Sequence, residues 1–202
     1  MSTGTTVALH PTEPKVSTPL QQLMYGLIYP AVLGTGIVLV GVRAAHHISA
    51  LNVLLDPSVQ LGVMAGLFFC ASFDSAFYWP AGETGKYTRW AFALDALEVA
   101  LMFVCFHFLR LFEDPAKLVP PFLPVAYLTL AGDVLLQFGW RALVGLNWTY
   151  RWKLRLSIAV VLIAGAFLGS RFEGTNVAIS AGVCAFVIVY VVSDPRYRKA
   201  SA

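Results

Sequence analysis

Charged residues are scarce in this sequence. Asp, Glu, Lys and Arg make up 12% of its 202 residues, whereas hydrophobic residues make up 58%, and the mean hydropathy is +0.71. A soluble domain of this size cannot bury so large an apolar fraction, so the composition excludes a sizeable soluble catalytic domain. The net charge is only +3, and the Lys and Arg residues are spread between apolar stretches. Because they form no single basic patch, a nucleic-acid partner is excluded as well.

Cysteines and short catalytic motifs are also sparse. Cys70, Cys105 and Cys184 fall in apolar stretches without paired spacing, so neither a disulfide framework nor a cysteine-based metal site is indicated. The sequence has no phosphate-binding glycine-rich loop, no HExxH pair and no serine-centred elbow. His46 and His47 are adjacent and would point to different sides of a helix, which does not suit metal binding. We expect no metal and no other cofactor.

What the sequence does contain is a series of apolar stretches of about 18 to 23 residues, long enough to cross a hydrocarbon core of about 30 Å. They predict an all-α membrane protein, a six-helix transmembrane bundle, with a polytopic domain at 19–194. Residues 1–18 are expected to form a flexible N-terminal tail, and 195–202 a short basic C-terminal tail. The six expected spans are Leu20–Val42, Val59–Trp79, Thr88–Phe112, Phe122–Val144, Lys153–Ser170 and Thr175–Ser193.

The distribution of Lys and Arg predicts the orientation of these spans, because short cytoplasmic loops are rich in both. If the N-terminus is cytoplasmic, only Arg43, Arg110, Lys117 and Arg171 lie outside. The other ten of the fourteen basic residues then lie on the cytoplasmic side: Lys15, Lys86, Arg89, Arg141, Arg151, Lys153, Arg155, Arg196, Arg198 and Lys199. We therefore expect a multi-pass protein of the cell membrane with its N- and C-termini cytoplasmic.

Two further patterns concern the lipid bilayer and helix packing. The connector Arg43–Ser58 carries apolar residues at amphipathic spacing, which fits a helix in the membrane interface and an ordinary loop equally well: Ile48, Leu51, Leu54 and Leu55. Small residues four positions apart let helix backbones approach closely. They predict packing within the bundle, with a homo-oligomer interface as the alternative: Gly62 and Gly66, Gly165 and Gly169, and Ala178 and Gly182.

Ionisable side chains inside the spans are the candidates for chemistry, because they are costly in hydrocarbon and normally face a bundle interior, a partner or a water-filled cavity. Asp74 lies on the second span, Asp95 and Glu98 on the third, and Asp133 with Gln137 on the fourth. At about 1.5 Å of rise per residue, the four carboxyl groups lie about 7 to 14 Å from the expected cytoplasmic ends of their spans. The sequence predicts that they converge on one layer in the cytoplasmic half.

Helical spacing also predicts which side chains share a face with these acids. Asp95 and Glu98 share one face of the third span, and Asp133 shares a face of the fourth with Gln137, Trp140 and Arg141. Arg141 is the one basic residue on a matching face, so the surplus carboxyl groups must hold protons or bind cations. The residues expected to contact a ligand are Tyr78, Trp90, Gln137, Trp140 and Arg141. Alternatively, the acids only tie helices together.

Three functions fit this predicted layer, and we favour the first. It is the transport or conduction of protons or small cations, with Asp74, Asp95, Glu98 and Asp133 as relay or coordinating groups. The second is an intramembrane enzyme that uses paired carboxyl groups as general acid and base on a lipid or isoprenoid ligand. The third is a membrane assembly or substrate-binding subunit whose polar layer serves packing.

A short stretch resembles the membrane-bound terpene cyclases, which place an acidic residue ahead of aromatic residues on an early span. The resemblance is carried by Phe73-Asp74 before Phe77-Tyr78-Trp79-Pro80, and by Trp90 through Leu94-Asp95 on the next span. It implies the second function, an intramembrane enzyme. The chain departs from that family in two ways: its last span, Thr175–Ser193, has no acid where the family uses one, and the family's usual seventh span is missing.

Overall fold

The structure, a computed structural model, describes residues 19–46, 50–78, 87–114, 121–144 and 152–192, and these residues form helices and no strand. The two predicted tails lie outside the described residues. A helix is present at each of the six predicted positions. The helices, in chain order, are α1 (Pro19–Leu23), the π-helical η1 (Met24–Ile28), α2 (Tyr29–Ala45), α3 (Ala50–Leu55), α4 (Pro57–Tyr78), α6 (Arg89–Phe108), α7 (Leu123–Leu143), α8 (Trp152–Arg171), the 3₁₀ turn η3 (Glu173–Thr175) and α9 (Asn176–Val192).

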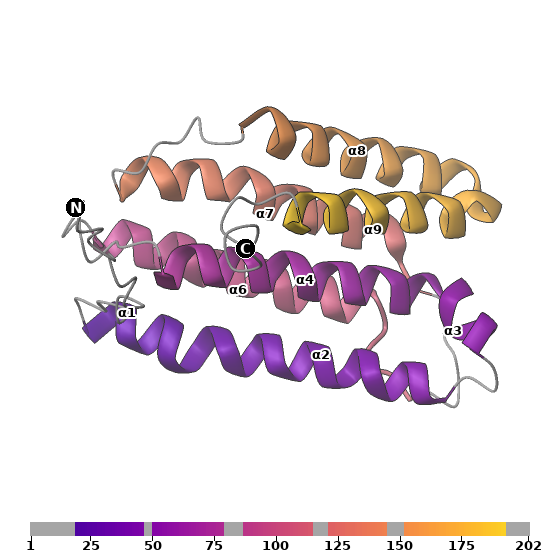
Figure 1. Ribbon diagram of the computed structural model, residues 1–202, viewed down its shortest axis with the longest axis horizontal. Coiled ribbons are helices and arrows are strands. Elements are labelled where there is room, and N and C mark those ends of the chain that lie inside the picture. The colour runs from indigo at the N-terminus through magenta and orange to yellow at the C-terminus, as the bar shows by residue number, and fades with distance from the viewer. Residues whose placement is uncertain (1–18, 47–49, 79–86, 115–120, 145–151, 193–202) are drawn as a thin grey trace, which may run out of the picture.

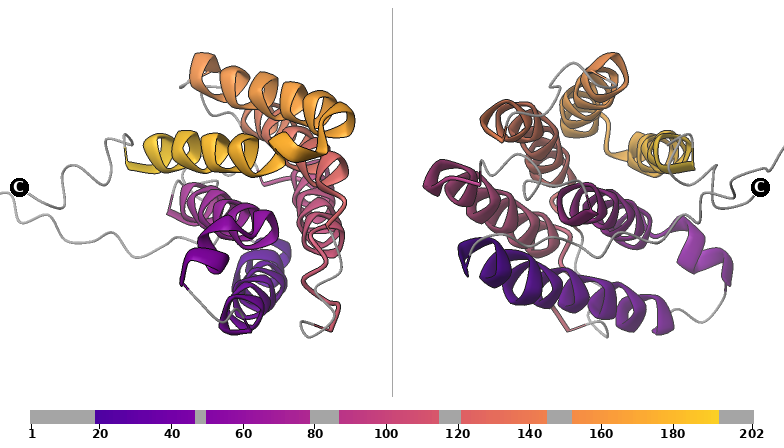
Figure 2. Two further views of the ribbon diagram at one scale, coloured as in Figure 1. Left: turned by 90° about the vertical axis from the view of Figure 1, so that its right-hand side faces the viewer. Right: turned by 60° about the vertical axis from the view of Figure 1, so that its left-hand side comes forward.

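The long helices lie side by side along one common direction (Figure 1). In cross-section they form a ring in which α2 packs against α4, α4 against α9, α9 against α8, α8 against α7, α7 against α6, and α6 against α2 (Figure 2). Pro19 and the C-terminal end of α9 lie toward the same end of this bundle (Figure 1). The start of α6, the end of α7 and the start of α8 are at that end too, which brings helices distant in sequence together there.

The composition of the helices supports the prediction that this chain is a membrane protein. Three helices are long and apolar enough to cross a bilayer: Pro19–Ala45, Arg89–Phe108 and Trp152–Arg171. Pro57–Cys70 and Asn176–Val192 are shorter apolar helical stretches. Large hydrophobic side chains face outward along the bundle, for example Val38, Phe167 and Val189, each more than 60% exposed. An apolar outer surface of this extent is costly in water and favourable in lipid.

The first long helix contains a π turn whose cause is visible in the sequence. Pro30 lacks a backbone N–H, and its ring would clash with the carbonyl group of Gly26 in a regular α-helix. The chain accommodates this residue with the π turn η1, immediately before α2. Residues four apart in an α-helix drift by about 40° around the axis. The wider π turn offsets that drift, so Gln21, Tyr25 and Tyr29 are all buried on one side.

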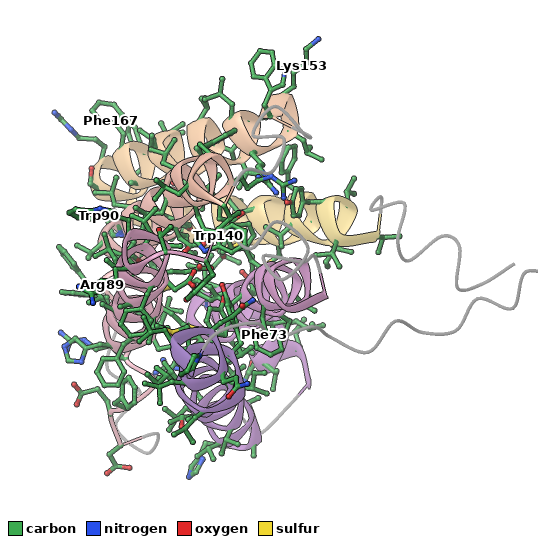
Figure 3. All side chains as sticks on the ribbon, turned by 90° about the vertical axis from the view of Figure 1, so that its left-hand side faces the viewer. Phe73, Arg89, Trp90, Trp140, Lys153 and Phe167 are labelled. Carbon is green, nitrogen blue, oxygen red and sulfur yellow. The ribbon has the colours of Figure 1, made fainter. Side chains whose placement is uncertain are left out.

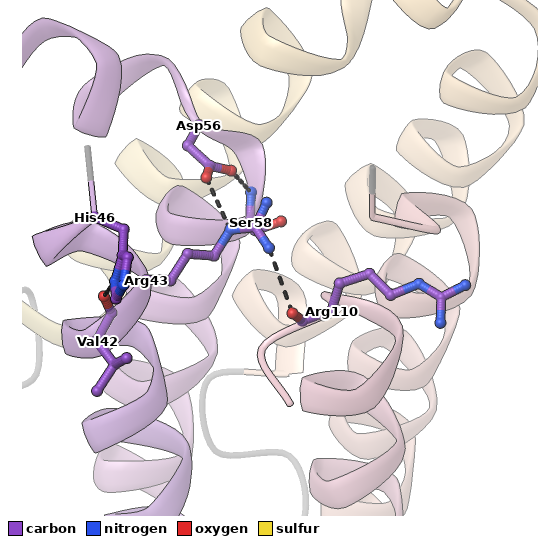
Figure 4. Close-up of polar contacts among 6 residues, drawn as sticks. All are labelled: Val42, Arg43, His46, Asp56, Ser58 and Arg110. Carbon is purple, nitrogen blue, oxygen red and sulfur yellow. Dashed lines mark hydrogen bonds and ion pairs between the residues drawn. The ribbon is translucent and has the colours of Figure 1, made fainter. Parts of the chain in front are cut away.

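A buried ion pair joins three helices at the opposite end of the bundle (Figure 4). Arg43, near the end of α2, donates from Nε to Asp56 Oδ2 at 2.8 Å, and from Nη1 to the carbonyl oxygen of Arg110 at 3.3 Å. Asp56 also caps α4, because its Oδ1 accepts the backbone N–H of Ser58 at 2.8 Å and Pro57 begins the helix. The charged groups satisfy each other and the free backbone groups of the helix ends.

The helix of the third predicted span is shorter than expected. It ends at Phe108 instead of Phe112, and the chain then turns through Arg110, whose φ of 59° is in the left-handed region. This turn presents the Arg110 carbonyl group to Arg43. The apolar character of the segment continues beyond the helix because Leu109 and Leu111 are buried. Hydropathy alone therefore extended the prediction past the true helix end.

Two of the three predicted small-residue pairs, Gly62 with Gly66 and Gly165 with Gly169, contribute contacts within the chain, whereas a methyl group on Gly182 would meet nothing within 4 Å. A methyl group on Gly62 would meet Val40 of α2, one on Gly165 would meet Ile179 of α9 at 3.0 Å, and one on Gly169 would meet Asn176. These glycines therefore lie at close helix contacts. The predicted connector contains the short helix α3, whose Leu51, Leu54 and Leu55 side chains are at least half exposed.

Candidate functional site

An aromatic and apolar cluster surrounds Asp95 near the end of the bundle where α6 begins. Its buried members come from η1, α6 and α7 and from the chain next to them: Met24, Tyr25, Tyr87, Ala91, Trp140 and Val144. Asp95 is 1% exposed and six residues into α6, about 9 Å along the helix axis. A carboxyl group placed so deeply among apolar side chains requires hydrogen bonds or a proton.

Two tyrosines supply hydrogen bonds to Asp95. The Tyr25 hydroxyl donates to Asp95 Oδ2 at 2.9 Å, and the Tyr87 hydroxyl donates to the same oxygen at 2.5 Å. Asp95 Oδ1 is buried and has no hydrogen-bond partner among the described residues. The Trp140 indole interacts with this carboxyl group, yet its Nε1–H is also buried without completing a hydrogen bond to a described residue. Only one of the two carboxyl oxygens of Asp95 therefore has hydrogen-bond partners among the described residues.

Tyr87 is held over Asp95 by the start of α6. Thr88 is the N-cap, with its side-chain oxygen accepting the Ala91 N–H at 3.3 Å, which fixes the direction in which the chain enters the helix. Burial, together with the negative charge of Asp95, raises the pKa of Tyr87 well above its ordinary value. Tyr87 therefore stays protonated at physiological pH and remains a hydrogen-bond donor to Asp95.

Glu98, one turn further along α6, interacts with the first and fourth long helices. The Tyr29 hydroxyl is 3.0 Å from Glu98 Oε1 and 3.2 Å from the carbonyl oxygen of Phe69. Glu98 also interacts with Asp133 of α7, a fully buried residue whose Oδ1 has no hydrogen-bond partner among the described residues. Gln137 Nε2, one turn along α7, donates to Asp133 Oδ2 at 3.2 Å.

The proximity of Glu98 and Asp133 has a direct chemical consequence. Two ionised carboxyl groups repel each other strongly in a buried site, so one of the two is favoured in its protonated form. A proton on one carboxyl group would also let it donate a hydrogen bond to the other. Tyr25 and Tyr87 donate to Asp95, Tyr29 bonds to Glu98 and Gln137 donates to Asp133, which makes a polar layer across η1, α2, α6 and α7.

The described residues contain no group of three or more His, Cys, Asp or Glu side chains arranged to hold a metal ion. The three acids are instead spread along two helices, and tyrosine hydroxyl groups bond to two of them, Asp95 and Glu98. This arrangement suits proton binding and exchange between neighbouring groups.

The chain matches no known family. Comparisons with protein-family models, with curated proteins and with solved structures each gave no match. The candidate site must therefore be interpreted from its own chemistry.

The structure brings together most of the described residues that the sequence singled out. Asp95, Glu98, Asp133 and Gln137 lie in the polar layer, and Trp140 points into the bundle beside it (Figure 3). Arg141, at the same end of α7, is 4% exposed and is not without an interaction partner.

Other candidates are placed elsewhere or are not described. Trp90 is 74% exposed and points away from the bundle, apart from the acid layer (Figure 3). The side chains of Asp74 and Tyr78 lie outside the described residues, although the helix that carries them is described. Phe73, the neighbour of Asp74, packs against Tyr25 and Tyr29, with ring centroids 6.0 and 5.4 Å apart respectively.

The three tyrosines of the site were not predicted from the sequence. They carry no formal charge, and the first span has no charged residue in its middle. The usable signal was the spacing of Gln21, Tyr25 and Tyr29, which repeats polar groups every four residues ahead of Pro30. Tyr87 carried no comparable signal, because its approach to Asp95 depends on how the chain enters α6.

Proposed function

We propose that this chain is a six-helix transmembrane protein, with both termini cytoplasmic, that binds and transfers protons through Asp95, Glu98 and Asp133. The observation that carries this proposal is the buried, neighbouring pair of carboxyl groups of Glu98 and Asp133, which is favoured when one of the two holds a proton. Acidic residues linked by hydrogen bonds inside a membrane bundle are typical of proton pathways. The apolar outer surface and the three helices of spanning length support the membrane setting.

Orientation and depth support access from the cytoplasm. The excess of Lys and Arg in the connectors favours a cytoplasmic location for the end of the bundle where α6 begins. Asp95 is about 9 Å from that end along α6 and Glu98 about 13 Å. Toward the other end, the interior is filled by apolar side chains, including Met102, Phe106 and Leu130. A proton entering from the cytoplasm would reach Asp95 before Glu98 and Asp133.

Two buried polar atoms without hydrogen-bond partners indicate where a proton would enter. Asp95 Oδ1 and Trp140 Nε1 both lack a hydrogen-bond partner among the described residues. A water molecule between them would accept from the indole and donate to the carboxyl group, which would satisfy both. Such a water would give Asp95 a neighbour with which to exchange a proton, while the tyrosine hydroxyl groups hold the other oxygen in place.

The experiment is a proton-flux assay in proteoliposomes with a trapped pH dye and an imposed potassium diffusion potential. Glu98→Gln and Asp133→Asn keep the side-chain shape but remove the titratable groups, so we expect both to abolish flux. Glu113→Gln and Asp114→Asn are matched controls, because these two exposed residues follow α6 at the other end of the bundle. The controls should conduct as the wild type does. A silent wild type, or unchanged flux in both site variants, would refute proton transfer.

A second candidate is an intramembrane enzyme acting on a lipid or isoprenoid. One observation favours it: a cavity of about 200 Å³ between α2 and α4, with an almost entirely apolar lining of Ile37, Val40, Gly62, Val63, Gly66, Leu67 and Cys70. A hydrocarbon chain could occupy this cavity, and the protonated carboxyl pair could then act as a general acid. Mass spectrometry of lipids that copurify with the protein tests this function. Recovery of bulk membrane lipids in their ordinary proportions would argue against it.

A further inference from the structure

Arg155 is a buried cation that has no part in the proposed proton transfer. It lies in the first turn of α8 and is only 4% exposed. It belongs to the buried face of that helix, in line with Ile158, Ala159 and Leu162. Its guanidinium carbon is 5.9 Å from the centroid of the Phe138 ring on α7. Packing against this ring offsets at most part of the free-energy cost of burying the guanidinium charge.

The hydrogen-bonding groups of Arg155 are incompletely satisfied. Nε and Nη1 are both buried and have no hydrogen-bond acceptor among the described residues. A guanidinium group does not lose its proton in a protein, so Arg155 cannot become neutral. A buried charge without an ionic partner is strongly destabilising. An anion is therefore the missing partner of this side chain.

The position of Arg155 indicates which anion is available. It is three residues from Trp152, about 4.5 Å along the helix axis, at the end of the bundle that we propose to be cytoplasmic. Trp152 is 43% exposed and Lys153 lies 5.9 Å over its ring, an arrangement typical of the membrane interface. Phospholipid phosphate groups lie at this depth. The start of α8 adds the positive end of the helix dipole.

We propose that Arg155 binds a phosphate group at the interface between the starting turn of α8 and the end of α7. Arg matches the geometry of phosphate oxygens, and basic pockets between membrane helices bind the head groups of anionic lipids. The side chain has several rotatable bonds and lies one turn from the helix end, so its head can turn toward the interface to meet the phosphate. The site does not depend on the proposed proton transfer.

The test measures phosphate-dependent stabilisation of the whole protein in detergent micelles. One arm adds phosphatidylglycerol, with phosphatidylcholine as the uncharged comparison, and another adds inorganic phosphate alone. Intact-complex mass spectrometry counts the bound lipids, and the thermal unfolding midpoint reports stabilisation. The variants are Arg155→Gln, Arg155→Lys and Arg171→Gln. Arg171 is the matched control because it lies on the same helix over a phenylalanine ring, Phe167, but is exposed.

We expect the wild type and Arg171→Gln to bind phosphatidylglycerol in preference to phosphatidylcholine. Arg155→Gln should weaken that binding by roughly tenfold or more, the loss expected for a charge-assisted hydrogen bond. Arg155→Lys keeps the charge but loses the planar donor group, so it should bind with intermediate affinity. It also keeps the test valid if Arg155→Gln does not fold.

The two ligand arms distinguish the sources of phosphate. Stabilisation by phosphatidylglycerol alone identifies a lipid site, whereas stabilisation by inorganic phosphate that depends on Arg155 identifies a site for a free anion. Either result supports the phosphate site. Equal affinity of the wild type and Arg155→Gln for both ligands overturns it, as does equal affinity of the wild type and Arg155→Lys should Arg155→Gln not fold. No preference of the wild type for any phosphate anion overturns it as well.

Discussion

Tyr87 donates a 2.5 Å hydrogen bond to Asp95, eight residues further along the chain, from just before the first turn of α6. Tyr25 donates to the same carboxylate oxygen from the first long helix. The two bonds hold one side of Asp95 between helices that are far apart in sequence, and its other oxygen is left for exchange. The polar layer therefore depends on tyrosine hydroxyl groups as well as on carboxyl groups.

Tyr87→Phe is expected to destabilise the protein at neutral pH. The variant removes a donor from a buried carboxyl group, and such a loss typically costs about 1 to 3 kcal/mol. Chemical unfolding in detergent micelles measures the difference. Phe122→Ala, which shortens an exposed ring elsewhere in the described part of the chain, should have a smaller effect.

The pH dependence of stability should also change in Tyr87→Phe. Because folding raises the pKa of Tyr87, its contribution is fully present below the unfolded-state pKa of about 10 and is lost as the pH rises above it. Unfolding midpoints at pH about 8 and about 11 should therefore differ more in the wild type than in the variant. An equal alkaline loss in both proteins would show that Tyr87 is not held protonated by the fold.

The helix positions were predictable because apolar stretches of spanning length dominate the sequence. The grouping of Asp95, Glu98 and Asp133 was predictable as well, since depth and helix face follow from residue spacing. The tyrosines that form hydrogen bonds with these acids were not predictable in this way. Tyr25 and Tyr29 are four residues apart, and the π turn before Pro30 aligns them more closely than an ideal helix period does.

Other features of the site depend on three-dimensional packing that residue spacing does not encode. Trp90 and Trp140 are both aromatic residues near the ends of helices, yet one is 74% exposed and the other 8%. Which of them faces the acids is decided by how α6 and α7 pack against each other. Arg155 is similar to the basic residues around it in sequence, and only its burial in the first turn of α8 distinguishes it.

Gly36→Ala tests the contact between α2 and α6. A methyl group at this position would overlap the Phe106 ring, so the ring or the helix has to move. Overpacking of this kind usually costs about 1 to 3 kcal/mol. The control is Gly34→Ala on the same helix, where the methyl group would meet nothing within 4 Å. Gly34→Ala should leave stability unchanged or raise it by up to about 1 kcal/mol, through helix propensity.

The unfolding midpoints of the two glycine variants in detergent micelles give the comparison directly. If Gly36→Ala were as stable as Gly34→Ala, α2 would not approach Phe106 as closely as the structure has it.

Asp56→Asn is expected to be strongly destabilising because it leaves Arg43 as a buried charge without its anionic partner. Removing one member of a buried pair costs about 3 to 5 kcal/mol. Glu113→Gln breaks the more exposed pair with Arg110, in which the side chains are 31% and 42% exposed, so it should cost less than about 1 kcal/mol. Denaturant unfolding of both variants measures the contrast, and similar costs would contradict the buried ion pair.

The central claim is that Glu98 and Asp133 share an exchangeable proton, and infrared spectroscopy of carboxyl C=O stretching tests it most directly. The account predicts a protonated carboxyl band at neutral pH in the wild type that shifts in D₂O. The band should be weaker in Asp133→Asn and in Glu98→Gln than in the wild type, and unchanged in Glu113→Gln. A wild-type spectrum without a protonated carboxyl band, or a band that neither site variant weakens, would contradict the account.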